Sequence, residues 1–129
     1  MELLFAIFFQ DVTAAMGAPL THRANDMTRF LRSEASRTYG WREVSAAEAQ
    51  DFANQGFLTV AAWYNPQGHP GHVAIVRPEQ DGFAFAEHHG PIIANAGGTN
   101  FNIGTTLQGF GRHLINTTFH VHDDDYPVS

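Results

Sequence analysis

The sequence contains no cysteine among its 129 residues. Without cysteine the chain forms no disulfide, supplies no thiolate to a metal ion and offers no thiol nucleophile. Basic residues are also scarce, because seven Lys and Arg face thirteen Asp and Glu and give a net charge of -6. A nucleic-acid surface needs a basic patch that neutralises phosphates. We therefore expect no nucleic-acid partner.

Long hydrophobic runs are missing as well, and the most hydrophobic stretch is the opening "MELLFAIFF". It is far shorter than the roughly 20 apolar residues of a membrane-spanning helix. It also lacks the basic start and the small-residue cleavage site of an export signal. Leu4, Phe8 and Ala15 recur at helical spacing before Gly17 and Pro19, which predicts a buried helix and no membrane span.

The length and the 43% hydrophobic content predict a single domain over residues 1–129. Asn25 is the expected cap of a helix that ends before Gly40. Ser45 and Glu48 form a capping box, which predicts a further short helix that ends at Gly56.

The second half of the chain has the composition and spacing that are typical of β-strands. "FLTVAAWY" and "HVAIVRP" flank the turn-forming "NPQGHPG" and predict a β-hairpin. Residues 81–98 predict a turn with one or two strands, and "INTTFHVH" predicts a last strand. Helices followed by strands, without alternation, indicate an α+β domain whose helices pack on an antiparallel sheet.

A candidate catalytic pair lies on the predicted strands. His72 starts the second strand of the hairpin, where rigid backbone meets an open loop, and this place suits a general base. Asn95 lies within another apolar run, and a buried amide needs a hydrogen-bond partner. We expect the imidazole of His72 to be that partner. A base oriented by a polar side chain and facing a nucleophile on a helix is the pattern of a catalytic triad.

Four stretches together carry a family resemblance: "DVTAAMGAP", "EAQDFANQGFLTVAAWYNPQGHPGHVAIVRP", "IIANAGGTNFNIG" and "GFGR". Their layout resembles the NlpC-like peptidoglycan hydrolases, which are papain-fold cysteine peptidases and amidases related to the CHAP domains. The resemblance covers most of the chain. It implies a papain-like fold in which a thiolate attacks an amide of the peptidoglycan peptide stem. His72 would then be its base and Asn95 the residue that orients the imidazole.

The same resemblance carries further expectations. No cofactor is expected, and the partner is the peptide stem of peptidoglycan. Action would take place in the periplasm, outside the cell, or after delivery by a phage or a secretion system. Trp63 and Tyr64, with His69 in the hairpin loop, are the candidate substrate-binding residues, although Trp63 and Tyr64 also fit a core position.

The sequence departs from the family at the nucleophile. Counting back from Asp11 and Val12, the Cys-Asn pair of the family falls on Phe5 and Ala6. Phenylalanine is no nucleophile, and no Ser or Thr precedes Thr13. The chain as written is therefore expected to be an inactive homologue. Two explanations stay open: a degenerate relative, or a domain truncated at its N-terminus because Met1 is not the native start.

Structural roles for the same residues, and two other functions for the chain, are alternatives to this hypothesis. His72 and Asn95 both suit hydrogen-bonded core positions, Trp41 suits the core, and Asn100 and Asn102 suit turns. A non-catalytic cell-wall-binding or interaction module would keep the groove without the chemistry. A metal-binding protein would use paired histidines, namely His69 and His72, His88 and His89, and His120 and His122 with the "DDD" that follows. Their spacing matches no helical His-Glu-x-x-His pattern, so we assign no metal ligand.

Overall fold

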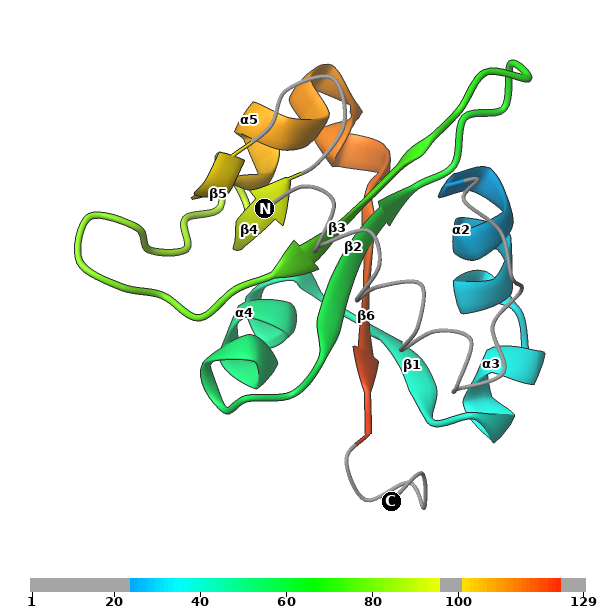
Figure 1. Ribbon diagram of the computed structural model, residues 1–129, viewed down its shortest axis with the longest axis horizontal. Coiled ribbons are helices and arrows are strands. Elements are labelled where there is room, and N and C mark those ends of the chain that lie inside the picture. Colours follow the sequence, from blue (N-terminus) through cyan, green and yellow to red (C-terminus); the bar gives the residue numbers. More distant parts are fainter. Residues whose placement is uncertain (1–23, 96–100, 124–129) are drawn as a thin grey trace.

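The computed structural model describes residues 24–95 and 101–123 (Figure 1). The predicted N-terminal helix, Phe5, and Asn100 lie outside these residues. The elements are α2 (Ala24–Arg32), α3 (Ala35–Thr38), β1 (Trp41–Val44), α4 (Ala46–Asn54), β2 (Thr59–Trp63), β3 (His72–Val76), β4 (Ile92–Asn95), β5 (Phe101–Thr105), α5 (Thr106–Phe110), the 3-10 helix η1 (Gly111–Asn116) and β6 (Thr118–His122). The predicted α+β class is confirmed.

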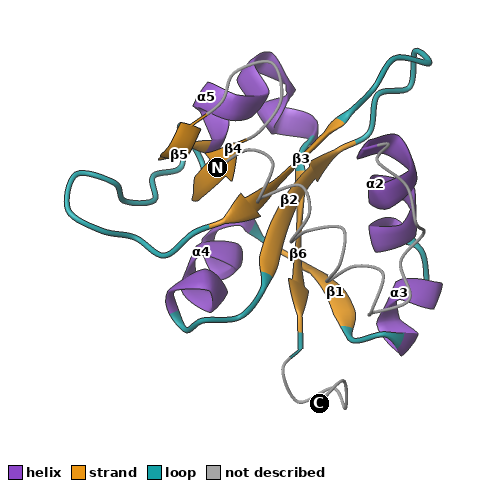
Figure 2. Cartoon of the chain, in the orientation of Figure 1, coloured by secondary structure: helices purple, strands orange, loops and turns teal. Residues whose placement is uncertain are grey.

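The strands form one six-stranded sheet in the order β1-β6-β2-β3-β4-β5, and every neighbouring pair is antiparallel (Figure 2). The predicted hairpin is β2 and β3, in which Trp63 pairs with His72 and Val60 with Ile75. The predicted last strand, β6, lies between β1 and β2. His72 therefore starts an interior strand of the sheet.

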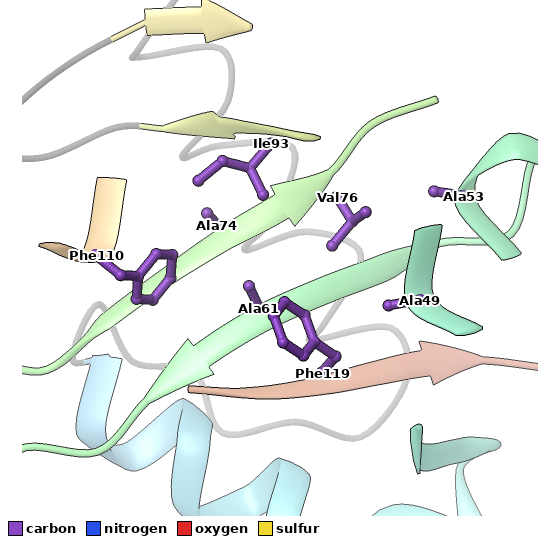
Figure 3. Close-up of a cluster of buried hydrophobic side chains, with 8 residues drawn as sticks. All are labelled: Ala49, Ala53, Ala61, Ala74, Val76, Ile93, Phe110 and Phe119. Atoms are coloured by element: carbon purple, nitrogen blue, oxygen red, sulfur yellow. The ribbon is translucent and has the colours of Figure 1, made fainter. Parts of the chain in front are cut away.

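Two hydrophobic clusters cover the two faces of the sheet. Along β2, Ala61 belongs to one cluster whereas Val60 and Ala62 belong to the other, as the two-residue period of a strand requires. The first cluster joins the sheet to α4 and α5 and consists of Ala49, Ala53, Ala61, Ala74, Val76, Ile93, Phe110 and Phe119 (Figure 3). The second joins it to α2 and consists of Met27, Leu31, Trp41, Val60 and Ala62. The fold is thus three layers with the sheet in the middle.

The single helix predicted between Asn25 and Gly40 is wrong, because the chain forms α2 and α3 with a break between them. Ser33 Oγ donates to the carbonyl of Phe30 at 2.6 Å, and Ser36 Oγ donates to the carbonyl of Ser33 at 2.8 Å. Serine hydroxyls that bond nearby carbonyls compete with the helical pattern. The break lets α3 turn toward β1.

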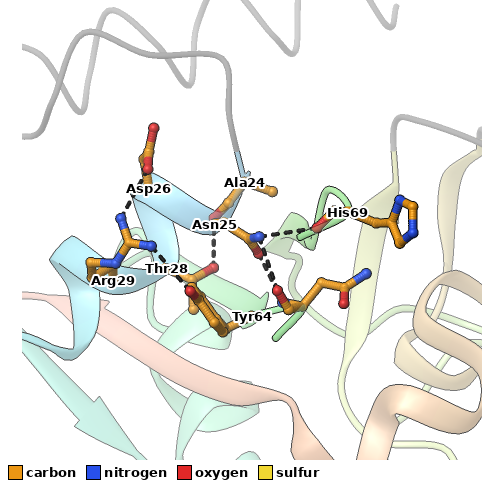
Figure 4. A network of polar contacts seen from close by, with 8 residues as sticks. Ala24, Asn25, Asp26, Thr28, Arg29, Tyr64 and His69 are labelled. Atoms are coloured by element: carbon orange, nitrogen blue, oxygen red, sulfur yellow. Dashed lines mark hydrogen bonds and ion pairs between the residues drawn. The ribbon is translucent and has the colours of Figure 1, made fainter. Parts of the chain in front are cut away.

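The predicted capping role of Asn25 is also wrong, since α2 begins at Ala24. Its side chain instead holds the β2–β3 loop (Figure 4). Oδ1 accepts from the Asn65 N–H at 2.8 Å, while Nδ2 donates to the carbonyls of Asn65 at 3.1 Å and His69 at 3.0 Å. A Cβ on Gly71 would lie only 2.5 Å from Asn25 Oδ1. This loop therefore needs glycine at Gly71 to stay docked on α2.

Two strands were not predicted. β1 is a four-residue edge strand whose Trp41 is 1% exposed and so occupies the core as expected. β5 includes Asn102, which therefore lies in a strand and not in the predicted turn; its carbonyl accepts from Arg77 Nη1. The predicted helix with the Ser45 and Glu48 capping box is confirmed as α4.

Candidate functional site

The side chains of His72 and Asn95 meet across neighbouring strands, as expected. His72 is the first residue of β3, and Asn95 is the last residue of β4. The imidazole Nε2 forms a short hydrogen bond with Asn95 Oδ1. Asn95 is only 4% exposed, whereas His72 is half-buried. The amide is thus fixed in the protein interior, and the imidazole bonded to it remains partly accessible to solvent.

This contact determines which ring nitrogen of His72 is basic. An amide oxygen only accepts hydrogen bonds, so the proton resides on Nε2 and Nε2–H is the donor. Nδ1 then carries the lone pair, and it has no hydrogen-bond partner within residues 24–95 and 101–123. An imidazole fixed in one tautomer with its other nitrogen available is suited to accept a proton.

The pKa of His72 supports the same chemistry. Burial lowers the pKa of His72 below its ordinary value of 6.5, and the hydrogen bond to Asn95 opposes part of that effect. Burial disfavours the charged form of an imidazole. The ring is therefore neutral at pH 7, which is the state that a general base requires.

The short helix α5 packs against the pair. Phe110 is 4% exposed, and its ring centroid lies 4.5 Å from that of His72 with an interplanar angle of 57°. Thr105 and Gln108 form a capping box at the start of this helix, with Thr105 Oγ1 accepting from Gln108 N at 3.1 Å. The capping box stabilises the first turn of α5.

Trp63 lies directly opposite His72 in the β2–β3 ladder, so both side chains are on the same face of the sheet. Its indole stacks on the imidazole of His113, with ring centroids 3.7 Å apart and an interplanar angle of 16°. His113 belongs to η1, which follows α5 directly. Trp63 therefore has one ring face covered by protein.

The predicted substrate-binding residues separate into two groups. Trp63 and Tyr64 are half-buried and line one cleft of about 740 Å³, but His69 does not line it. The side chain of His69 is exposed, and its carbonyl is held by Asn25. The other residues that line the cleft are Arg32, Glu43, Pro66, Ile115, Asn116, Thr117 and Thr118. Neither His72 nor Asn95 lines it, but Trp63, which does, is the ladder partner of His72.

A second cleft of about 560 Å³ adjoins the first, because both are lined by Glu43, Ile115, Thr117 and Thr118. The residues that line only this cleft come from the end of β1 and the start of α4, from the loop before β4, from β6, and from α5 and η1. They are Val44, Ser45, Ala46, Glu87, Gly90, Leu107, Gly111, Arg112, Leu114 and Phe119. Leu107 is 41% exposed, and the shared Ile115 is 86% exposed. We refer to these two adjoining clefts as the trough; Trp63 and Tyr64 are among the residues that line it.

The histidine pairs of the metal hypothesis do not gather into a set of three or more ligands within the described residues. His120 and His122 are 0% and 1% exposed. His120 Nε2 lies 2.8 Å from Thr118 Oγ1, and His122 Nε2 donates to the carbonyl of Tyr39 at 2.8 Å. Across the residues that the structure describes, no three His, Asp or Glu side chains group as metal ligands would. Asp124 and Asp125 lie outside those residues.

Sequence reasoning missed Gly109, Phe110 and His113. The only signal for Gly109 and Phe110 was the "GFGR" stretch that contributed to the family resemblance, and His113 follows that stretch directly. Nothing in a local pattern indicates that a five-residue helix packs against two strands distant in sequence. Tertiary packing alone places these residues at the site.

Within residues 24–95 and 101–123, no helix has the length and apolar character needed to cross a membrane. A comparison with models of protein families matches none of them, and a comparison with curated proteins finds no similar sequence.

Proposed function

We propose that this chain is a papain-like domain of the NlpC type that binds the peptide stem of peptidoglycan and, as written, does not hydrolyse it. One observation carries the proposal: the hydrogen bond between His72 Nε2 and Asn95 Oδ1. This bond leaves the second nitrogen as a lone-pair base on a half-buried ring, which is the arrangement that activates a thiol.

The chain supplies a base without a matching nucleophile. It contains no cysteine, and Phe5 occupies the position at which the family resemblance calls for one. A base that has lost its nucleophile contributes nothing to amide cleavage. Binding is the part of the function that the remaining residues can perform.

The trough beside Trp63 suits a peptide ligand. Its walls provide the aromatic side chains of Trp63 and Tyr64, the cation of Arg32 and the carboxylate of Glu43. Aromatic faces contact apolar side chains and sugar rings, while the two charged groups pair with a carboxylate and an amine. A peptide stem carries groups of all these kinds.

Binding is tested by co-sedimentation of the purified chain with insoluble peptidoglycan. Saturable binding is expected, and Trp63→Ala should weaken it by about tenfold, as truncation of an aromatic anchor does. Gln67→Ala is the matched control, because Gln67 is an exposed residue of the adjoining loop. No saturable binding by the wild-type chain would overturn the proposal.

The inherited chemistry is tested by restoring the nucleophile with Phe5→Cys and Ala6→Asn. The restored chain should release new amino termini or sugar-free peptides from peptidoglycan. Adding His72→Gln to the same chain should abolish that release, because glutamine accepts no proton at neutral pH. Release that is equal with and without His72→Gln would contradict the role of His72 as base.

A further inference from the structure

Helix α5 approaches Asn95 unusually closely at Gly109. A Cβ built on Gly109 would lie 2.7 Å from Asn95 Oδ1 and 2.9 Å from Asn95 Cγ. Such distances are well inside ordinary contact, so any side chain at this position would displace the amide. The displaced atom, Oδ1, is the same atom that accepts the hydrogen bond from His72.

The next residue of the same helix contacts the other member of the pair. The ring of Phe110 packs on the imidazole of His72 at a centroid distance of 4.5 Å. Gly109 therefore borders the acceptor, and Phe110 borders the donor ring. Two consecutive residues of α5 thus contact the two side chains that form the hydrogen bond.

We propose that Gly109 and Phe110 are positioning residues: the missing side chain of Gly109 makes room for the Asn95 amide, and the Phe110 ring fixes the His72 imidazole against it, so that Nε2 carries the proton and Nδ1 the lone pair. The proposal deepens the proposed function, on which it rests for its chemical purpose. Neither residue is expected to touch the peptide stem.

The position of Gly109 is not explained by helix geometry. α5 is five residues long, and glycine inside a helix is destabilising by about 1 kcal/mol relative to alanine. No residue within residues 24–95 and 101–123 other than Ile93 and Asn95 comes as near to a Cβ at Gly109. The glycine thus opposes local helix stability and serves its contact with β4.

The test is the tautomer of His72, measured from the ¹⁵N chemical shifts of Nδ1 and Nε2 in the full chain. His72→Gln identifies its signals among the eight histidines. The wild-type ring should be the Nε2–H tautomer. Gly109→Ala should raise the Nδ1–H fraction by about tenfold, which corresponds to the loss of one good hydrogen bond. It should also lower the pKa of His72, because the bond to Asn95 raises that pKa.

Gln108→Ala is the matched control. It removes the α5 capping box and so weakens the helix, but it adds no atom near Asn95. The tautomer of His72 should remain that of the wild type. An equal shift in Gln108→Ala and Gly109→Ala would overturn the proposal, because general loosening of α5 would then be the cause. A wild-type tautomer in Gly109→Ala would overturn it as well.

A second comparison covers the case in which Gly109→Ala fails to fold. In the Asn95→Ala background the new methyl group no longer meets an amide. Gly109→Ala should then fold and change the free energy of unfolding much less than it does in the wild type. An equal penalty in both backgrounds would assign the crowding to Ile93 and refute the role of Gly109.

These outcomes are separate from those of the binding test. A chain with the expected tautomer and the expected response to Gly109→Ala, but no affinity for peptidoglycan, would keep the positioning role and refute the proposed function. A chain that binds peptidoglycan, but whose Gly109→Ala variant keeps the wild-type tautomer of His72, would keep the proposed function and refute the positioning role.

Discussion

The indole of Trp63 lies parallel to the imidazole of His113, 3.7 Å away between ring centroids, and this stack joins the central strand β2 to η1. Trp63 also pairs with His72 on β3. Trp63 thus belongs both to the ladder that carries the base and to the lining of the trough. The stack connects the helical turn after α5 to the sheet at the point where the two parts of the site meet.

The first prediction concerns this stack. His113→Ala should lower the free energy of unfolding by about 1 kcal/mol beyond the loss of buried area, because a stacked aromatic pair contributes about that much. Urea unfolding followed by tryptophan fluorescence measures it. Arg112→Ala, an exposed neighbour on the same helix, should have almost no effect. Equal midpoints for both variants would contradict a stabilising stack.

The second prediction concerns the charge next to His72. Asn95→Asp places a carboxylate where the amide oxygen accepts the hydrogen bond from Nε2. An adjacent negative charge favours the imidazolium, so the pKa of His72 should rise by about one unit or more. An NMR titration reports it. Asn102→Asp, at an exposed position of the neighbouring strand β5, adds the same charge and should leave the titration of His72 unchanged.

Much of the fold follows from local patterns. The capping box of Ser45 and Glu48 sets the start of α4, and the alternation of the hairpin strands sets β2 and β3. The meeting of His72 and Asn95 was predictable, because a buried amide and a strand-leading imidazole each need a partner. Papain-like topology and a role in the cell wall remain proposals.

The features that the sequence did not predict correctly have physical causes. The break after α2 depends on serine hydroxyls that bond carbonyls, which apolar spacing does not report. β1 has four residues and little alternation, because only Trp41 is fully buried. Gly109 was overlooked because its significance lies in a contact with Asn95, across a sequence separation that no local pattern spans.

The third prediction concerns pH. His120 is fully buried, between Arg32 on α2 and Glu43, its partner on β1. Burial, and secondarily the charge of Arg32, lowers the pKa of His120 from 6.5 to about 4. Between these values the unfolded chain binds a proton that the folded chain does not. The contribution of His120 to the free energy of unfolding should therefore be complete above pH 6.5 and be lost as the pH falls toward 4.

The decrease from His120 is about 3 kcal/mol over the whole window. Urea unfolding at several pH values measures the slope, and His120→Gln should make it shallower. His88→Gln removes an exposed histidine and should keep the wild-type slope. The prediction is wrong if His120→Gln and the wild type lose stability in parallel as the pH falls.

The last prediction concerns Gln50, a 2% exposed residue on α4. Its Nε2 donates to the carbonyl of Arg77 at 2.8 Å, and its Oε1 accepts from the N–H of Ile92 at 2.8 Å. One side chain thus satisfies backbone groups at the end of β3 and the start of β4, the strands that carry His72 and Asn95.

Gln50→Ala would leave the buried N–H of Ile92 without its acceptor, which costs about 1 to 3 kcal/mol. Urea unfolding should show that loss. Gln55→Ala, in an exposed position just after the same helix, should stay close to the wild type. Because the lost bonds hold β3 against β4, amide exchange should also accelerate at Ile92 and Arg77 more than in the β1–β6 ladder. Uniform acceleration across the sheet would mean that Gln50 supports global stability and not the alignment of the strands that bring His72 to Asn95.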